Sequence, residues 1–201
     1  MQLIVISSPE KVADEAAIIN GLFQAGLSRL HLRKPGSNQQ QLCTLLDGID
    51  HAFYNRIALH QHHELGQAYG ITRLHYPEQV RKKMMQYEWE DQYAKGHSLS
   101  TSMHDFEGIA TLTAFDYLFF GPVFNSLSKP GYNSRLPLGF SLEKRPDIKP
   151  QVMAIGGIEP QNIPTAKAMG FDGIAVLGAI WGQPEKAIST FENLQDTINT
   201  I

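Results

Sequence analysis

The sequence has 201 residues, of which 42% are hydrophobic and 18% are charged, the balance of an ordinary globular protein with one sizeable core. Its formal net charge of −3 excludes a basic field that would recruit nucleic acid or an anionic membrane, and no apolar run is long enough to span a bilayer. The single cysteine, Cys43, excludes an intramolecular disulfide and fits a reducing compartment, so we expect a cytoplasmic protein.

Short apolar runs alternate with helical patterns along the whole chain. The runs that we expect to be strands are 3–6, 30–32, 57–59, 74–76, 98–102, 117–120, 152–155 and 174–177. Apolar residues at helical spacing predict helices near 13–23, 41–53, 106–113, 141–145, 160–169 and 185–198, with a short one ending at 69. The charge-rich stretch 78–96 is expected to form one solvated helix and a linker.

Eight strand–helix alternations imply parallel strands joined by right-handed crossovers. Such units close into a small (β/α)8 barrel, or TIM barrel, so we expect a single α/β domain over residues 1–201. An open doubly wound sheet is the alternative, but the glycines lack the spacing of a dinucleotide site. Barrel active sites lie at the carboxyl ends of the strands. The polar residues expected on that rim are Ser7, Arg33, His60, Ser102, Ser126, Ser128 and Lys129.

The clearest candidate site follows the sixth expected strand. Ser126, Ser128 and Lys129 offer two hydroxyl groups and one cation, which suit a phosphate or a diphosphate. A polar surface loop that carries a lysine is the alternative. After the seventh and eighth strands, Gly157 and Gly178 would let backbone N–H groups bind a phosphate, or would only serve tight turns.

Histidines are the acid/base candidates, because their unperturbed pKa lies close to neutral. We favour His60 and His31 for this role, and the patterns around His31 and His75 leave open whether these two point into the barrel or outward. His62 and His63 beside His60 suggest a metal, but adjacent residues point in different directions. Because no cysteine or close carboxylate completes a ligand set, we expect no metal site here.

Five motifs occur in an order and at spacings that resemble thiamine phosphate synthase and the related thiazole tautomerase, over essentially the whole chain. They are LHLR at 30–33, SMH at 102–104, FGPVFNSLSK at 120–129, AIGGI at 154–158 and GFDGIAV at 170–176. The resemblance implies a (β/α)8 barrel that joins a hydroxymethylpyrimidine diphosphate to a thiazole phosphate, releasing diphosphate, with Mg²⁺. Stabilising the leaving diphosphate would then be the main catalytic task.

The resemblance also implies roles for individual residues. The residues implied to hold the thiazole phosphate are Ser126, Ser128, Gly157, Leu177 and Gly178. The residues implied to hold the pyrimidine diphosphate are Arg33, Ser102 and Lys129. The expected partners are therefore small phosphorylated molecules, with neither nucleic acid nor membrane, and a homo-oligomer is left open.

The sequence departs from the synthase pattern in the diphosphate half of the site. Synthases usually carry Asn-Asp after the third strand, the Asp binding Mg²⁺, where this chain has His60 and Gln61. The second metal-binding Asp falls near Val80, with only Glu78 close, and a further lysine is replaced by Pro35. We therefore expect at most weak Mg²⁺ binding and no other cofactor.

This pattern favours the tautomerase branch, which isomerises a thiazole carboxylate phosphate and needs neither diphosphate nor metal. His31, where synthases usually have glutamine, also resembles that branch, but Pro122 stands where its acid/base histidine would be. The proton would then have to pass through His31 or His60. The first hypothesis is therefore an enzyme of thiamine biosynthesis, either a synthase with altered metal use or a tautomerase-like isomerase. Two alternatives remain: a non-catalytic binder of thiazole phosphate or thiamine phosphate, and an unrelated phosphate-binding barrel such as a phosphosugar isomerase.

Overall fold

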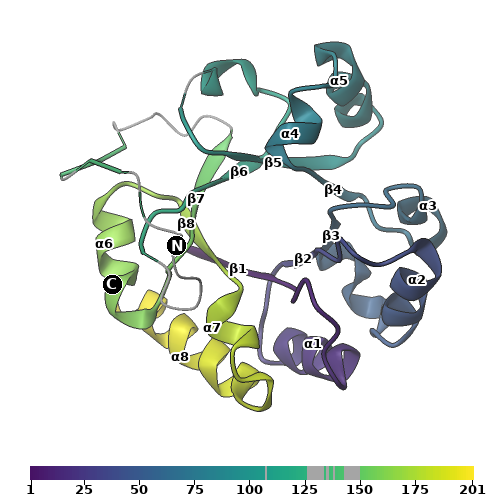
Figure 1. Ribbon diagram of the computed structural model, residues 1–201, viewed down its shortest axis with the longest axis horizontal. Coiled ribbons are helices and arrows are strands. Elements are labelled where there is room, and N and C mark those ends of the chain that lie inside the picture. Colours follow the sequence, from purple (N-terminus) through teal and green to yellow (C-terminus); the bar gives the residue numbers. More distant parts are fainter. Residues whose placement is uncertain (107, 126–133, 135, 138, 143–149) are drawn as a thin grey trace.

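The computed structural model describes residues 1–106, 108–125, 134, 136–137, 139–142 and 150–201 (Figure 1). Eight parallel strands form a closed barrel in chain order. This confirms the predicted (β/α)8 fold. The strands are β1 (Gln2–Ile6), β2 (Leu30–Leu32), β3 (Ile57–Leu59), β4 (Arg73–Tyr76), β5 (Ser98–Met103), β6 (Tyr117–Phe120), β7 (Gln151–Ile155) and β8 (Gly173–Val176).

The helices lie outside the ring of strands (Figure 1). The α-helices are α1 (Glu15–Gln24), α2 (Gln39–Asp47), α3 (Leu65–Tyr69), α4 (Glu78–Arg81), α5 (Gln86–Ala94), α6 (Ile163–Ala168), α7 (Gly178–Trp181) and α8 (Ala187–Asn199). The 3-10 helices are η1 (His51–Arg56), η2 (Ile109–Thr111), η3 (Pro160–Asn162) and η4 (Pro184–Lys186). No helix in these described ranges is both long and apolar enough to cross a membrane.

Three helix predictions were wrong in detail. The helix expected over 41–53 ends at Asp47 of α2, and the 3-10 helix η1 follows it. Stretch 78–96 forms two helices, α4 and α5, rather than one. The helix expected over 106–113 is reduced to the short turn η2, because Gly108 adopts a left-handed φ of 76° that breaks an α-helix. Most of the helix expected over 141–145 lies outside the described residues.

The strands separate two cores. Between strands and helices lies the larger one, which includes Leu30 and Leu32 of β2 and Leu74 and Tyr76 of β4. Because successive side chains of a strand point to opposite faces, the residues between these positions point into the barrel.

The interior of the barrel is polar on one side and apolar on the other. Its apolar residues come from β6, β7, β8 and β1 and are Ile4, Ile6, Tyr117, Phe119, Met153 and Ala175. On the opposite side, His31 of β2, His75 of β4 and Ser100 of β5 are at most 1% exposed. Buried polar groups need hydrogen-bond partners, so the candidate site is described from the partners of these three residues.

Candidate active site at the carboxyl ends of the strands

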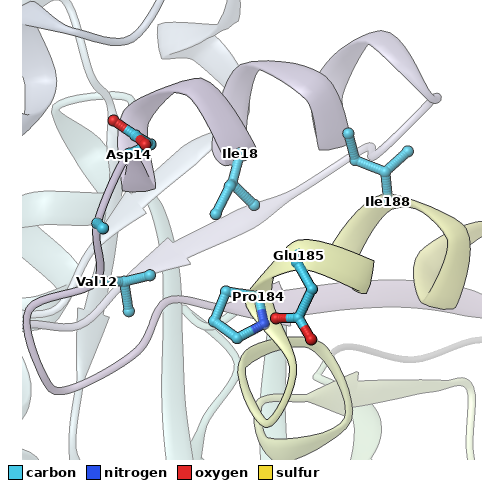
Figure 2. A pocket seen from close by; sticks show the side chains of 7 residues that line it. Val12, Asp14, Ile18, Pro184, Glu185 and Ile188 are labelled. Atoms are coloured by element: carbon cyan, nitrogen blue, oxygen red, sulfur yellow. The ribbon is translucent and has the colours of Figure 1, made fainter.

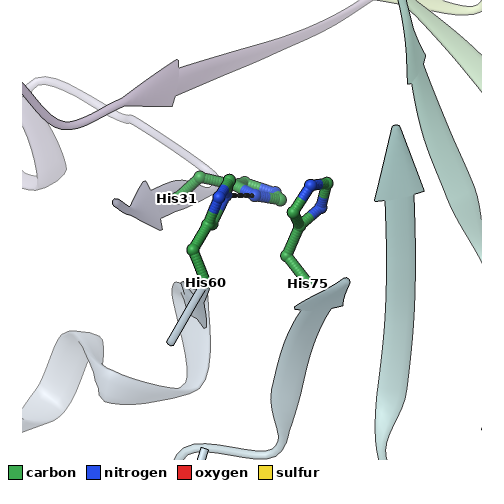
Figure 3. A group of neighbouring side chains, drawn as sticks. All are labelled: His31, His60 and His75. Carbon is green, nitrogen blue, oxygen red and sulfur yellow. Dashed lines mark hydrogen bonds between the residues drawn. The ribbon is translucent and has the colours of Figure 1, made fainter. Parts of the chain in front are cut away.

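Three histidines from neighbouring strands meet inside the barrel (Figure 3). His31 belongs to β2, His60 directly follows β3, and His75 belongs to β4. The distance between His31 Nδ1 and His60 Nε2 is 2.8 Å, that of a hydrogen bond. His31 Nε2 lies 2.6 Å from the hydroxyl oxygen of Tyr117. Both ring nitrogens of the buried His31 are therefore held, one by the strand-end histidine and one by the tyrosine of β6.

His75 is held in the same way by two serines of β5. Its Nδ1 lies 3.0 Å from Ser100 Oγ and its Nε2 lies 3.0 Å from Ser102 Oγ. Its ring stacks on that of His60, with the ring centroids 4.0 Å apart and the planes at 21°. Ser102 is thus placed at the same group of imidazoles, by a contact that sequence reasoning did not anticipate.

All three imidazoles are neutral near pH 7. Burial lowers the pKa of His31 and His60 well below 6.5, and the neighbouring imidazoles add to the effect. Burial also lowers the pKa of His75, to about 3. A neutral imidazole has one N–H donor and one nitrogen acceptor, so each of these rings can take up one proton while giving up another.

The fit of this group to a metal ion is poor as the side chains stand. One nitrogen from each of His31, His60 and His75 lies within 4.8 Å of the others, so the prediction that no ligand set assembles missed this approach. However, the first two are bonded to each other, and the stacked His60 and His75 rings cannot both aim an in-plane lone pair at one point. The arrangement is that of hydrogen bonding rather than ligation.

Mg²⁺, which the family resemblance implies, does not fit the described residues either. That ion prefers charged oxygen ligands, and the end of β3 carries the imidazole of His60 instead. The nearest predicted carboxylate, Glu78, is in contact with His104 and accepts from Lys82 Nζ at 2.8 Å. Its charge is therefore already compensated within the described part of the chain.

Arg33 follows β2 on the same rim as His60. Its backbone N–H donates to Ser7 Oγ at 2.8 Å, and the Ser7 hydroxyl donates to the Arg33 carbonyl at 3.1 Å, which ties the ends of β1 and β2 together. The positive charge of Arg33 helps to lower the pKa of His60 and His75. Within the described residues no ion pair neutralises it, which leaves a cation at the rim for an anionic ligand.

The glycines of the predicted phosphate site lie where neighbouring strands end. Ile155 of β7 pairs with Ala175 of β8, so Gly157 and Leu177 follow two adjacent strands at one rim, and Gly178 begins α7. Gly157 has a φ of +65°, and a Cβ there would lie 2.7 Å from the Phe124 carbonyl oxygen. The turn itself therefore requires glycine. The other predicted phosphate ligands, Ser126, Ser128 and Lys129, lie outside the described residues.

Sequence reasoning missed several members of the interior group. His75 had no assigned role, and Tyr117 was read only as part of an apolar strand. The period of two was a partial signal: His75 alternates with Leu74 and Tyr76, and because the structure places those two in the outer core, His75 faces inward. No sequence signal showed that Tyr117 would meet His31, because their partnership depends on strands on opposite sides of the barrel.

A separate hollow lies on the outside of the barrel, where the segment before α1 faces η4 and the start of α8 (Figure 2). Its labelled lining residues are Val12, Asp14, Ile18, Pro184, Glu185 and Ile188. None of the site residues predicted from the sequence lines this hollow, so the strand ends remain the candidate active site.

Comparison with known proteins agrees with the fold and with the motifs. The family model described as thiamine monophosphate synthase matches residues 3–180. A thiamine-phosphate synthase of Leuconostoc citreum is 23% identical over 201 residues, covering 94% of this chain and 93% of its own.

Two solved structures named thiamine phosphate pyrophosphorylase share the fold. The one from Pyrococcus furiosus has a TM-score of 0.77 at 19% identity and covers 99% of this chain and 96% of its own. The one from Bacteroides thetaiotaomicron has a TM-score of 0.73 at 24% identity and covers 99% and 98%. Since the family match spans nearly the whole barrel, the chain belongs to the thiamine monophosphate synthase family, a family of thiamine biosynthesis.

Proposed function

We propose that this chain isomerises a phosphorylated thiazole in thiamine biosynthesis by moving a proton from one substrate atom to another. This is the tautomerase-type reaction rather than the joining of thiazole and pyrimidine. In this proposal, His60 exchanges the proton with the substrate, and Arg33 provides a positive charge at the rim. The phosphate is held by backbone N–H groups near Gly157 and Gly178, together with Ser126, Ser128 and Lys129.

One observation carries the proposal. Where a synthase is expected to carry Asn-Asp, with the Asp binding the metal, this chain has His60 and Gln61, and His60 is a neutral imidazole whose Nε2 is hydrogen-bonded to the buried His31 at 2.8 Å. A neutral imidazole keeps one nitrogen lone pair that can accept a proton, and it is a poor partner for Mg²⁺ and diphosphate. The side chain is half-buried, so its second ring nitrogen, Nδ1, is the natural point of contact with a ligand at the rim.

The synthase reaction is the second candidate, and two observations favour it. The relatives and the matched family carry the synthase name. In addition, Arg33 is not neutralised by a carboxylate of the described residues, and an arginine suits a diphosphate. In that case Arg33, Ser102 and Lys129 would bind the pyrimidine diphosphate, and Mg²⁺ would have to bind without the usual carboxylates.

The proposal is tested with the purified protein and the thiazole carboxylate phosphate in its less stable tautomer, followed by ultraviolet absorbance or NMR. We expect conversion at a catalytic rate without added metal. His60→Gln should lower kcat by about 10²- to 10⁴-fold, the usual worth of a general acid–base group. His62→Asn is the matched control, because His62 adopts a φ of 53° that asparagine tolerates and lies outside the interior group.

The same preparation is then assayed for thiamine phosphate, with pyrimidine diphosphate, thiazole phosphate and Mg²⁺. Formation of thiamine phosphate at a catalytic rate, abolished by Lys129→Ala, would establish the synthase reaction and refute the proposal. No turnover in either assay, with thermal stabilisation by thiazole phosphate, would leave a non-catalytic binder.

A further inference from the structure

The Tyr117 hydroxyl has a single acceptor inside the barrel. Its oxygen lies 2.6 Å from His31 Nε2, the one partner that the described residues place in hydrogen-bond geometry with it. Tyr117 is 2% exposed, which shields the hydroxyl group from bulk water. The Arg29 guanidinium lies over the tyrosine ring, 4.7 Å from its centroid, but a guanidinium has no acceptor atom. The atom placed to accept the Tyr117 proton is therefore His31 Nε2.

The tyrosine keeps its proton near pH 7 and donates it to His31. Burial raises the pKa of the Tyr117 hydroxyl above 10, although the charges of Arg29 and Arg73 oppose the shift. A buried O–H group that donates to nothing is costly, because burial has removed the water it would otherwise bond. The hydroxyl therefore donates to His31 Nε2, and this nitrogen carries no proton of its own.

The direction of this bond fixes the direction of the next one. A neutral imidazole has one N–H donor and one acceptor nitrogen, and burial keeps both His31 and His60 neutral by lowering their pKa well below 6.5. With Nε2 as the acceptor, the His31 proton lies on Nδ1, which is 2.8 Å from His60 Nε2. His31 therefore donates to His60 Nε2, and the His60 proton lies on the other ring nitrogen, Nδ1.

The opposite direction would leave a buried donor without an acceptor. If His60 carried its proton on Nε2, His31 would accept at Nδ1 and point its own Nε2–H at the Tyr117 oxygen. The tyrosine O–H would then need a second acceptor. Ser100 belongs to the other hydrogen-bonded group of the barrel interior, where its hydroxyl donates to the Leu74 carbonyl at 3.4 Å. The two groups are separate, so the first group sets its own direction.

We infer that Tyr117 is a positioning residue that acts through His31 and holds the His60 proton on Nδ1. Because His60 Nε2 is occupied by His31, Nδ1 is the ring nitrogen left for a ligand at the rim. A ligand therefore meets an N–H donor at His60 rather than a lone pair. The assignment concerns the resting protein and does not depend on which reaction it catalyses.

In the isomerisation proposed above, on which this step rests, the proton exchange at His60 starts with donation. His60 Nδ1 gives its proton to one substrate atom, Nε2 takes the Nδ1 proton of His31, and His31 Nε2 takes the Tyr117 proton. When His60 Nδ1 then takes a proton from the second substrate atom, the three transfers run backward and restore the resting forms. Between the two stages the substrate has gained one positive charge and the Tyr117 oxygen one negative charge, which the Arg29 guanidinium over the ring offsets.

Nitrogen NMR of the ligand-free protein tests the assignment without any substrate, because protonated and unprotonated ring nitrogens have well separated shifts. We expect His31 and His60 both to carry the proton on Nδ1, in about tenfold or greater excess over the Nε2 form. Tyr117→Phe removes only the hydroxyl group and should bring the two forms of His60 to comparable populations. Tyr54→Phe is the matched control, since the Tyr54 hydroxyl donates to the Leu46 carbonyl outside the barrel interior, and it should leave the populations unchanged.

His31→Gln provides a second variant that does not depend on the folding of Tyr117→Phe. A glutamine can accept from Tyr117 with its carbonyl oxygen and donate to His60 Nε2 with its amide group, so His60 should keep its proton on Nδ1. The amide cannot pass a proton onward, so kcat for isomerisation should fall by about tenfold or more. Loss of the Nδ1 form of His60 in this variant would contradict the direction of bonds assigned here.

Kinetics separate failure of this inference from failure of the proposed function. We expect Tyr117→Phe to lower kcat for isomerisation by about tenfold or more with KM unchanged, while Tyr54→Phe leaves both constants unchanged. A resting protein with His60 protonated on Nε2, or a Tyr117→Phe variant with unchanged tautomers, would overturn the inference even if the protein is an isomerase. His60 in the Nδ1 form without turnover would refute the isomerase function and leave the positioning role of Tyr117 in place.

Discussion

Lys34 offers a sharp test of how the rim is built, because the adjacent Arg33 and Lys34 look alike in the sequence. Lys34 is 4% exposed, and its Nζ lies 2.5 Å from Glu15 Oε2 and donates to the Glu10 carbonyl at 2.8 Å. Lys34→Met removes both contacts and leaves Glu15, itself 6% exposed, as a buried carboxylate without its cation. Removing one partner of such a pair costs about 3–5 kcal/mol of unfolding free energy.

The effect should depend on pH. Burial raises the pKa of Glu15 above 4.5 even though Lys34 opposes the shift, so loss of Lys34 should raise that pKa further. A carboxyl group with a raised pKa in the folded state stabilises that state when protonated, and the stabilisation is lost as pH rises through the folded pKa. The destabilisation of Lys34→Met should therefore be larger at pH 7 than at pH 5.

Urea unfolding at both pH values, with circular dichroism as the readout, measures this effect. In thermal unfolding at pH 7, the melting temperature should fall by about 10 °C, at the few degrees per kcal/mol usual for this chain length. The double variant Lys34→Met/Glu15→Leu should recover most of the loss, because no charge is left buried. The control Lys95→Met breaks an exposed pair with Asp91 and should cost less than about 1 kcal/mol. A single variant as stable as the unmodified protein, or a double variant as unstable as the single one, would refute the reasoning.

Two further predictions concern the site. Gly157→Ala should cost about 1–3 kcal/mol of unfolding free energy, because the new Cβ would lie 2.7 Å from the Phe124 carbonyl oxygen at a φ of +65°. Gly36→Ala is the control, because a Cβ there would meet no atom within 4 Å. Equal melting temperatures of the two variants would contradict the steric argument. The pKa of His75 falls from 6.5 in the unfolded chain to about 3 in the folded protein. As the pH falls, His75 is therefore protonated in the unfolded state before the folded state, and the folded state loses stability that it has above pH 6.5. Between pH 6.5 and pH 5 the contribution of His75 to this loss should be about 2 kcal/mol. In urea titrations it is the amount by which the loss in the unmodified protein exceeds that in His75→Gln, and an equal loss in both proteins would show that His75 does not titrate as described.

The sequence predicted the barrel well, because the fold depends on local patterns. Every strand expected from an apolar run is present, and the period-two pattern around His31 and His75 already required one face of each strand to be buried. What the pattern could not show was which face looks into the barrel, because Leu30 and His31 are both buried. Only closure of the barrel, which turns one face of every strand inward, places His31 opposite Tyr117.

The site was predictable only in part, for similar reasons. The place of His60 and Arg33 follows from the rule that strand ends form the rim. Lys34, unlike the adjacent Arg33, is buried in an ion pair with Glu15, which lies in a helix 19 residues earlier in the chain. No local sequence pattern reveals this pairing. The pairing of His75 with Ser100 and Ser102 likewise depends on the register between β4 and β5, where His75 pairs with Ser100.

The central claim is that His60 moves protons and does not support diphosphate chemistry. The most direct test gives the purified protein the thiazole carboxylate phosphate in one reaction, and pyrimidine diphosphate, thiazole phosphate and Mg²⁺ in another. We predict isomerisation that persists with a chelator and is lost in His60→Gln but kept in His62→Asn, with no thiamine phosphate formed. Mg²⁺-dependent formation of thiamine phosphate at a catalytic rate, without isomerisation, would contradict the account.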